Sequence, residues 1–210
     1  IKNIIRDFDN LEIKDIKKPR VGLVGEILVK FHPTANNNVV DVIEREGAEA
    51  VMPELVNFFT AWSVNTVFKS DNLEGSKKSK LLAKLFINVA NFYQKTYVQE
   101  LKNSKRFSPP KDIRDLAEAT KKVVSLGNQT GEGWLLTGEM IELIESGVEN
   151  VICMQPFGCL PNHIIGKGSI KELKRLYKNA NIIPIDYDPS ASEVNQINRI
   201  KLMLSKAFKN

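Results

Sequence analysis

The sequence has no long apolar run and little cysteine or histidine, with only two of each among its 210 residues. A membrane-spanning helix needs about 18 or more consecutive apolar residues, and no stretch here approaches that length. The opening residues, IKNIIRDFDN, carry too much charge for a signal peptide. Two cysteines cannot form a disulfide framework, which is typical of proteins in a reducing compartment. We therefore predict a cytoplasmic protein with no membrane partner.

Several short catalytic and nucleotide-binding motifs are also absent. The sequence contains no G-x-S-x-G, H-E-x-x-H or G-x-G-x-x-G. The stretch Gly166-Lys-Gly-Ser169 resembles the end of a phosphate-binding loop, but Pro161 stands where that loop requires its first glycine. Hydrolase and dinucleotide-binding functions therefore lose their usual support in the sequence.

Positive charge is concentrated in one segment of the chain. Residues 76–111 contain nine Lys and Arg and one acid, whereas the whole chain has a net charge of +5. No aromatic–basic recognition motif accompanies this charge, so we predict no nucleic-acid partner. Four of its lysines are spaced seven or eleven positions apart, which places them on one face of a helix: Lys77, Lys84, Lys95 and Lys102. This face is either solvated or docks on an acidic surface, a partner subunit or a CoA phosphate.

Apolar patterns typical of strands alternate with patterns typical of helices, which predicts an α/β fold with a small, doubly wound parallel sheet of about four strands. We expect strands over residues 21–29, 48–52, 148–154 and 181–185. Helices are expected to begin near Asn36–Asn38, at Pro53, at Glu132 and at two capping-box sequences, Ser169–Glu172 and Ser190–Glu193. We expect the last helix to bury its apolar residues: Val194, Ile197, Ile200, Leu204 and Ala207.

Composition divides the chain into an arm and one domain. Residues 1–19 are polar and charged and are expected to form an arm or linker. A single α/β domain should cover residues 20–210, with a helical insertion over about 70–127. Within the insertion, the spacing of apolar residues predicts one helix from Lys77 to about Asn103 and another from Pro110 to Leu126. We expect the chain to be a fragment of a longer protein.

Ligands of a doubly wound sheet bind outside the carboxyl ends of its strands. The richest loop at such an end is MQPFGCLPNH, residues 154–163. Cys159 lies just beyond the expected strand and close to a helix start at Pro161. The N–H groups and dipole of that helix would favour the thiolate, which is the form that binds metals or attacks electrophiles. The alternative is a packing cysteine with no chemical role.

Cys153 lies inside the same expected strand, between Ile152 and Met154, and is interpreted as a small core residue. A zinc site formed by both cysteines with His32 and His163 is a weaker alternative, because the C-x5-C spacing is not typical of zinc sites. Neither cysteine therefore identifies a metal by its spacing alone.

Charged residues at or near the other strand ends are candidates for binding a ligand. Asp186 and Asp188 follow the last strand, and either accept hydrogen bonds from a ligand or cap the next helix. Glu26 lies in an apolar run and needs a partner, for which Lys30 and Arg199 are the candidates. A buried carboxylate without a counter-charge would destabilise the fold.

Three motifs resemble, in order, those of the 2-hydroxyglutaryl-CoA dehydratase D-component family. The first is GEILVKFHPTANNN, residues 25–38, and the second joins Gly138-Glu-Met to the loop QPFGCLP, residues 155–161. The third combines Asp186-Tyr-Asp with Asn195–Arg199. Together they span about residues 20–205, and the helical insertion is the least distinctive part. The wording QPFGCLPNHIIGKG is most similar to the dehydratase-like region of large bacterial proteins fused to a CoA-substrate-specific enzyme activase.

The resemblance implies flavodoxin-like domains and a [4Fe-4S] cluster held by cysteines from separate domains. It also implies that an ATP-dependent activase injects one electron, which permits radical loss of water from a 2-hydroxyacyl-CoA. Cys159 would be the cluster ligand contributed here, in a cofactor-binding loop that includes Phe157, Gly158 and Pro161. A cleft for an acyl-CoA would be lined by Lys30, Asn36, Asn37, Gln155, Asn162, His163, Asp186 and Asp188.

The sequence departs from the family pattern in its cysteine content. Cys159 is the one suitable ligand, whereas a stable cluster of this type usually needs about three or four protein ligands. The other ligands and the activase would therefore belong to other domains of the parent chain or to other proteins. We expect the present residues alone to hold no cluster and to be inactive. The parent would be an ATP-activated acyl-CoA dehydratase or a related reductase.

Two other functions compete with this hypothesis. A non-catalytic docking domain would bind an acidic partner through the basic helical insertion, with Cys159 incidental. A small-molecule-binding α/β domain would use the strand-end loops without a cluster. Loss of a cluster on substitution of Cys159 would favour the first hypothesis, and salt-sensitive association that does not depend on Cys159 would favour docking.

Overall fold

The computed structural model describes residues 1–208, and the chain forms two compact units. The helical unit comprises residues 1–17 and 54–115. The α/β unit comprises residues 18–53 and the chain from Leu116 onward. The helical unit thus takes in most of the residues expected to form an arm, and it begins before residue 70, where the insertion is expected to start.

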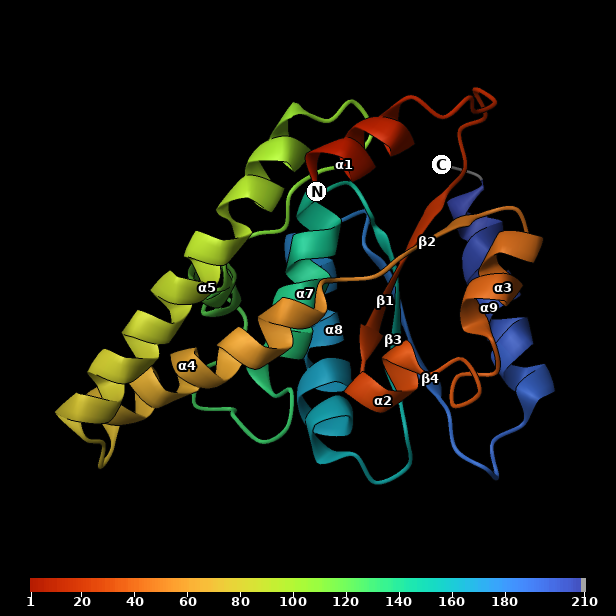
Figure 1. Ribbon diagram of the computed structural model, residues 1–210. Coiled ribbons are helices and arrows are strands. Elements are labelled where there is room, and N and C mark those ends of the chain that lie inside the picture. Colours follow the sequence, from red (N-terminus) through yellow and green to blue (C-terminus); the bar gives the residue numbers. More distant parts are fainter. Residues whose placement is uncertain (209–210) are drawn as a thin grey trace. The chain divides into compact units, whose positions relative to one another are not determined.

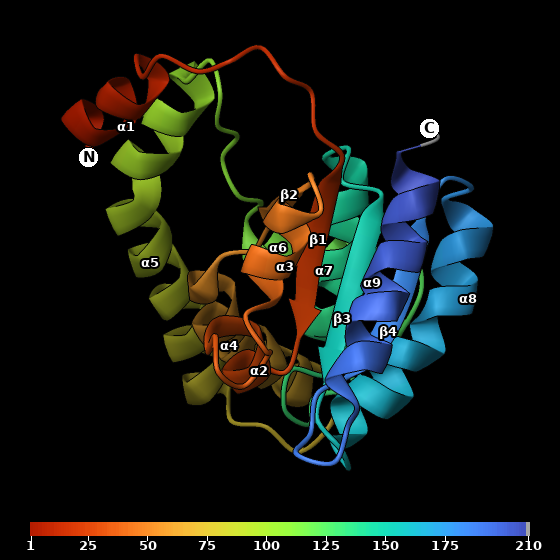
Figure 2. The ribbon, with the colours of Figure 1, turned by 90° about the vertical axis from the view of Figure 1, so that its right-hand side faces the viewer.

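Four parallel strands form the sheet of the α/β unit, as predicted. They are β1 (Arg20–Gly25), β2 (Glu49–Val51), β3 (Asn150–Gln155) and β4 (Asn181–Asp186). The strands pair in the order β2-β1-β3-β4 (Figure 2), which is the order of a flavodoxin-like fold. Because all four are parallel, their carboxyl ends lie at one edge, and folds of this kind bind ligands at that edge.

Helices cover both faces of the sheet (Figure 1), which explains the almost continuous apolar sequence of its central strands. One face packs against α2 (Ile27–Phe31), α3 (Val39–Arg45) and α9 (Glu193–Ala207). The other packs against α7 (Trp134–Glu145) and α8 (Lys167–Leu176). Leu23 and Ile152 belong to the first core, and their neighbours Val24 and Cys153 belong to the second. Successive side chains of a strand point to opposite faces, so each central strand serves both cores.

The first strand ends at Gly25, so the prediction of a strand over residues 21–29 is wrong beyond that residue. Gly25 has a φ angle of 142°, and a Cβ atom there would lie 2.0 Å from the carbonyl oxygen of Met154. Glu26 then caps α2, because its carboxylate accepts a hydrogen bond from the N–H of Val29 at 2.8 Å. The N–H of the first turn of α2 therefore stabilises the Glu26 carboxylate, which does not need the counter-charge that a carboxylate buried inside a strand would require.

The capping box predicted at Ser169 is wrong, because α8 begins at Lys167. A π-helical turn over Pro161–Gly166 runs directly into α8, so the helix needs no separate cap at that point. The Ser169 hydroxyl instead donates a hydrogen bond to the carbonyl oxygen of Gly166 at 3.0 Å. The helix start predicted at Pro161 is confirmed, and it lies close behind Cys159.

The cap of α9 is Ser192 rather than Ser190. The Ser190 N–H instead donates to the carboxylate of Asp188, in the turn that precedes the helix. The prediction that Val194 is buried is also wrong, since this side chain is 65% exposed. The buried side of α9 follows Gln196, Ile200, Met203 and Leu204, and Val194 lies on the opposite side of the helix.

The helical unit is built on a hairpin of α4 (Leu55–Asn72) and α5 (Lys77–Asn103), drawn in orange and yellow-green in Figure 1. The helix predicted from Lys77 to about Asn103 is confirmed. The hydroxyl of Ser76 caps it by accepting a hydrogen bond from the N–H of Lys78. The helix predicted over residues 110–126 is shorter, because α6 covers only Ile113–Thr120. Within residues 1–208, no helix combines the length and the apolarity that crossing a membrane requires.

A short helix, α1 (Lys2–Asp9), occupies part of the expected arm. The Asp9 carboxylate accepts hydrogen bonds from the Ser104 hydroxyl and the N–H of Lys105, just beyond the end of α5. The bond from Ser104 is the main reason why the pKa of Asp9 is lowered. At the other end of α1, Lys2 pairs with Glu100 of α5 at 3.3 Å. Polar contacts therefore attach both ends of α1 to α5.

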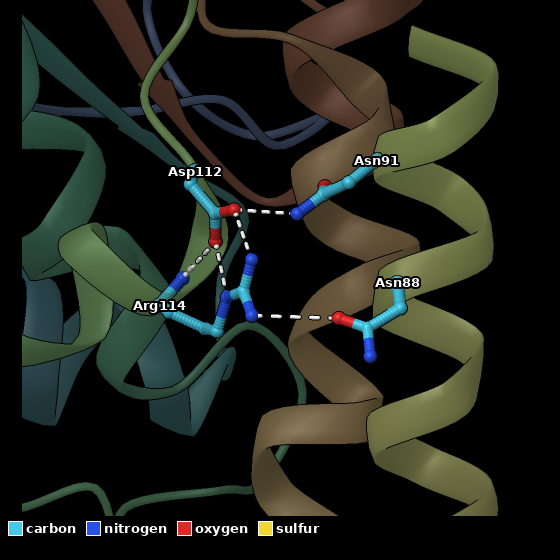
Figure 3. Close-up of polar contacts among 4 residues, drawn as sticks. All are labelled: Asn88, Asn91, Asp112 and Arg114. Carbon is cyan, nitrogen blue, oxygen red and sulfur yellow. Dashed lines mark hydrogen bonds and ion pairs between the residues drawn. The ribbon is translucent and has the colours of Figure 1, made fainter. Parts of the chain in front are cut away.

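Asp112 and Arg114 attach the chain beyond α5 to the side of that helix (Figure 3). The Asp112 carboxylate accepts hydrogen bonds from Nδ2 of Asn91 and from the Arg114 guanidinium. The guanidinium also donates to Oδ1 of Asn88 at 3.5 Å. The hydrogen bonds from Arg114 lower the pKa of Asp112. Polar side chains therefore hold residues 112–114 against α5.

Candidate functional site

The loop between β3 and the π-helical turn, residues 156–160, lies at the carboxyl end of a central strand. The N–H of Cys159 donates a hydrogen bond to the carbonyl oxygen of Pro156 at 3.3 Å, which closes a tight turn. Gly158 has a φ angle of 73° in this turn, and that conformation favours glycine. Phe157 is 86% exposed. The turn therefore fixes the position of Cys159 relative to the carboxyl end of β3.

Asn162 lies between the two cysteine side chains. It is fully buried, and its Nδ2 is 3.1 Å from the Sγ of Cys159. Its Oδ1 is 3.9 Å from the Sγ of Cys153 on β3. Asn162 belongs to the π-helical turn, so the local helix places its side chain back over the loop. The sequence predicts Asn162 as a cleft residue, whereas the structure places it beside both sulfur atoms.

The Cys153 thiol is one of the two hydrogen-bond partners of the Asn162 amide. Burial in the core, together with the negative charge of Glu139, raises the pKa of the Cys153 thiol to about 12. The thiol is therefore neutral at physiological pH and acts as a donor, with Oδ1 of Asn162 as its acceptor. The other side of the amide then directs an N–H toward Cys159, whose Sγ accepts it.

The two cysteines are consequently not equivalent. Cys153 is a core residue, as predicted, whereas Cys159 is half-buried. The Asn162 N–H is a donor to the Cys159 sulfur, and such donors stabilise negative charge on sulfur. A sulfur that is both accessible and hydrogen-bonded in this way is suited to binding a metal or to attacking an electrophile.

The residues present fit one ligand position of a metal cluster and do not fit a whole cluster. Within residues 1–208, no group of three or more His, Cys, Asp and Glu side chains is arranged to hold a metal ion. The zinc alternative with Cys153, Cys159, His32 and His163 is therefore wrong. Any cluster at this edge requires donors beyond the residues described here.

A groove of about 770 Å³ opens beside the carboxyl end of β4. Four residues predicted for the site line it together: Phe157, His163, Asp186 and Asp188. The helix α9 supplies further polar residues, among them Asn195, Gln196, Asn198 and Arg199. The groove thus carries two carboxylates, a guanidinium and several amides. It can bind a ligand that presents both an anionic group and hydrogen-bond donors.

Amide side chains form hydrogen bonds with Asp186, which lines this groove. Gln155 is buried, and its Nε2 donates to the Asp186 carboxylate at 2.6 Å. Gln196 donates to the carbonyl oxygen of Asp186 at 2.8 Å and accepts from Nδ2 of Asn37 at 2.8 Å. The structure therefore connects Asn37 and Gln155 to the groove through Asp186. Sequence reasoning missed Gln196, for which the available signal is a polar residue on the buried side of α9.

Two residues predicted for the cleft hold the fold together. Lys30 is buried, and its Nζ lies 2.8 and 3.0 Å from the carboxylate oxygens of Glu139 on α7. Burial raises the pKa of Glu139, and the ion pair with Lys30 counters this shift. Asn36 is also buried, where its Nδ2 donates to the carbonyl oxygen of Val29 and its Oδ1 accepts from the N–H of Val39. Both side chains are engaged in internal contacts.

Pro161 lines a second cavity of about 230 Å³. Leu160 and Ile164 also line it, together with residues 127–130. The loop around Cys159 thus contributes Phe157 to the groove and Leu160 to this cavity.

Comparison of the chain with models of known protein families, with curated proteins and with solved structures found no match.

Proposed function

We propose that Cys159 supplies one ligand of a [4Fe-4S] cluster that the α/β unit shares with other domains of the parent protein. The observation that carries the proposal is the N–H of buried Asn162, which points at the Sγ of a half-buried cysteine. Hydrogen bonds to cysteine sulfur are one of the means by which proteins tune iron–sulfur clusters. The amide is buried, and its oxygen lies 3.9 Å from the Cys153 sulfur, so both ends of the Asn162 side chain have a partner.

A shared cluster agrees with the donor set of this chain. Each contributing domain needs to present only one sulfur near its surface, and the loop at the end of β3 does so. The remaining ligands come from other domains of the parent protein. An ATP-dependent activase, which is a separate domain or protein, supplies electrons to the cluster.

The parent protein on this proposal is a 2-hydroxyacyl-CoA dehydratase or a related ATP-activated reductase. The resemblance of three sequence motifs supports this class, and two of them, 155–161 and 186–199, contribute residues that line the groove. When bound, a cluster of this kind supplies single electrons to the acyl-CoA. The groove then binds part of the acyl-CoA, with Arg199 available for an anionic group and Asp186 for a hydrogen-bond donor.

Anaerobic reconstitution of the full-length protein with iron and sulfide tests the proposal. Wild type and Cys153→Ala should each hold about four irons per cluster and give a cluster EPR signal after reduction. Cys159→Ser should lose most of this iron and the signal. Cys153→Ala is the matched control, because it removes the other sulfur contacted by Asn162 and leaves Cys159 in place. Equal iron in wild type and Cys159→Ser would overturn the proposal.

A further inference from the structure

The helix α5 has a second apolar face, opposite the side that it buries. The buried side carries Ala83, Ile87 and Leu101. Seven large apolar residues on the other side are exposed, from 44% for Val89 to 77% for Tyr93. They form what we call the α5 apolar face: Leu81, Leu82, Leu85, Phe86, Val89, Phe92 and Tyr93. At about 3.6 residues per turn these positions form one continuous stripe, and their centre lies about half a turn from the buried side.

Exposure on this scale indicates a binding surface. Single exposed apolar residues are common on proteins, but contiguous groups of large ones mark interaction sites. The α5 apolar face spans roughly 18 Å along the helix axis, about the length that a partner helix of three to four turns could cover. Two aromatic residues, Phe92 and Tyr93, are its most exposed members. Aromatic side chains of this kind often supply much of the binding energy of an interface.

Charge selects the partner. Lys77, Lys84, Lys95 and Lys102 lie along one edge of the α5 apolar face, and all four are exposed. None of them forms an ion pair within residues 1–208. The one acid of α5, Glu100, is paired with Lys2. The segment with Asp112 and Arg114 contacts α5 at Asn91 and Asn88, between Lys84 and Lys95. The edge therefore offers two pairs of unpaired positive charges, Lys77 with Lys84 and Lys95 with Lys102, which favours a partner with carboxylates in register.

A second copy of the chain fits this surface poorly. A twofold axis that makes two copies of α5 antiparallel places the lysine row of one helix beside the lysine row of the other. A parallel pair places each row beside the opposite edge, which carries no acid to pair with it. A bilayer surface is also less suitable, because membrane-surface helices carry cations across a broad polar face, and here the lysine row follows one edge.

We propose that the α5 apolar face binds an amphipathic helix of a partner protein that carries a row of carboxylates along one edge. The partner buries apolar side chains on the stripe, and its carboxylates pair with the lysine row. The charged edge then fixes the direction and register of the partner, as charged flanking positions do in coiled coils. This inference is independent of the cluster proposed at Cys159, because none of its residues belongs to the α/β unit.

Two synthetic peptides and two matched protein variants test the inference. Both peptides are amphipathic helices with one leucine-rich face, and they differ only in carrying glutamates or lysines along one edge. The variant Lys84→Glu/Lys95→Glu reverses two charges beside the stripe. The control Lys171→Glu/Lys178→Glu makes the same change in net charge at exposed lysines of the α/β unit.

Fluorescence anisotropy should show the glutamate peptide binding wild type and control alike, and binding Lys84→Glu/Lys95→Glu about tenfold more weakly. The lysine peptide should show the reverse preference, which loss of folding cannot produce. The variant Leu85→Asn/Phe92→Asn should lose both peptides while keeping its helical circular dichroism, because both side chains are exposed in the folded protein.

Three results would overturn the inference. One is equal binding of both peptides to all the charge variants. Another is sedimentation of the wild type with phosphatidylserine-containing vesicles, but not with phosphatidylcholine vesicles, in the absence of peptide binding. The third is a concentration-dependent dimer that disappears in Leu85→Asn/Phe92→Asn. Iron content after reconstitution should stay unchanged in these variants, so failure here is distinguishable from failure of the cluster proposal.

Discussion

The two units of the chain differ in the share of their large apolar residues that is buried. In the α/β unit, Val21, Leu23 and Ile152 are wholly buried, since helices cover both faces of the sheet. In the helical unit, Trp62 of α4 and the α5 apolar face are exposed. Apolar side chains that are buried inside a unit stabilise that unit. Exposed apolar side chains stabilise a complex when a partner covers them. The core of the sheet is therefore covered within the α/β unit, whereas the α5 apolar face is left exposed.

The two units also differ in the kind of functional residues that they carry. Both cysteines, the groove beside β4 and its network of amides belong to the α/β unit. The unpaired lysine row belongs to the helical unit. A reactive sulfur needs neighbours that do not move, and a docking surface needs only an exposed face. Substitutions of matched type in the two units should therefore have very different effects.

Replacing a lysine with methionine should give the largest contrast. Lys30→Met leaves Glu139 buried without its counter-charge and should lower the free energy of unfolding by about 3–5 kcal/mol. Lys84→Met, at an exposed position of α5, should change it by about 0.5 kcal/mol or less. Urea unfolding can be followed by Trp134 fluorescence in a Trp62→Phe background for Lys30→Met in the α/β unit, and by helical circular dichroism for Lys84→Met in the helical unit.

The pH dependence of Lys30→Met sharpens this test. Burial already raises the pKa of Glu139, and without Lys30 the shift grows. The folded variant then binds a proton more tightly than its unfolded chain, so its stability should rise as pH falls from 7 toward 5. Lys30→Met/Glu139→Leu should remove this pH dependence and recover stability. A loss as small as that of Lys84→Met would mean that the ion pair does not support the fold.

Truncating a leucine in each unit should give the next largest contrast. Leu23 is wholly buried, and Leu23→Ala should lower the free energy of unfolding by about 2–5 kcal/mol. Leu82 is exposed, and Leu82→Ala should change it by about 0.5 kcal/mol or less. Chemical denaturation of both variants measures the difference. Similar losses at the two sites would show that the α5 apolar face is covered in the free protein.

Local patterns predicted those parts of the fold that depend on neighbouring residues. The parallel sheet follows from four short apolar runs, and α5 follows from its spacing and the cap at Ser76. The end of β1 could not be predicted in this way. Gly25 adopts its conformation because its backbone passes against the carbonyl oxygen of Met154, more than a hundred residues away. Periodicity also predicts α5, but it does not tell whether another element packs against the apolar stripe of that helix.

The sequence indicates which residues follow the strands at the candidate site, but not how their side chains are arranged. The loop around Cys159 and the groove residues Asp186 and His163 were all identified from their places after strands. The role of Asn162 depends on a π-helical turn that brings one amide to two sulfur atoms, and no local pattern signals such a turn. Lys30 is expected in the cleft from the resemblance, and no local pattern signals its ion pair with Glu139, which lies 109 residues further along the chain.

Substitutions at Asn162 should separate the two cysteines. At neutral pH, Cys159 should react with iodoacetamide while buried Cys153 stays unreactive. Asn162→Ala removes the N–H donor to the Cys159 sulfur and should slow alkylation roughly threefold to tenfold. Asn162→Asp places a carboxylate beside that sulfur and should slow it further. Mass spectrometry of the alkylated peptides gives each rate, and equal rates in all three proteins would show that the amide does not act on the sulfur.

The alkaline stability of the α/β unit should report the Cys153 thiol. Its pKa is raised by burial to about 12, whereas a cysteine in an unfolded chain titrates near ~8.5. Between these values the unfolded chain releases a proton that the folded protein retains. Stability is therefore full below about pH 8.5 and falls above it, by up to ~1.4 kcal/mol per pH unit.

Comparison with Cys153→Ala isolates this contribution. Tyr177, whose pKa burial also raises to about 12, remains in both proteins and cancels in the difference. Urea unfolding from pH 7 to 10 under reducing conditions should give a wild type that loses about 2 kcal/mol more than the variant by pH 10. Parallel curves would mean that Cys153 ionises in the folded protein. A charged Cys153 could not donate a hydrogen bond to Oδ1 of Asn162.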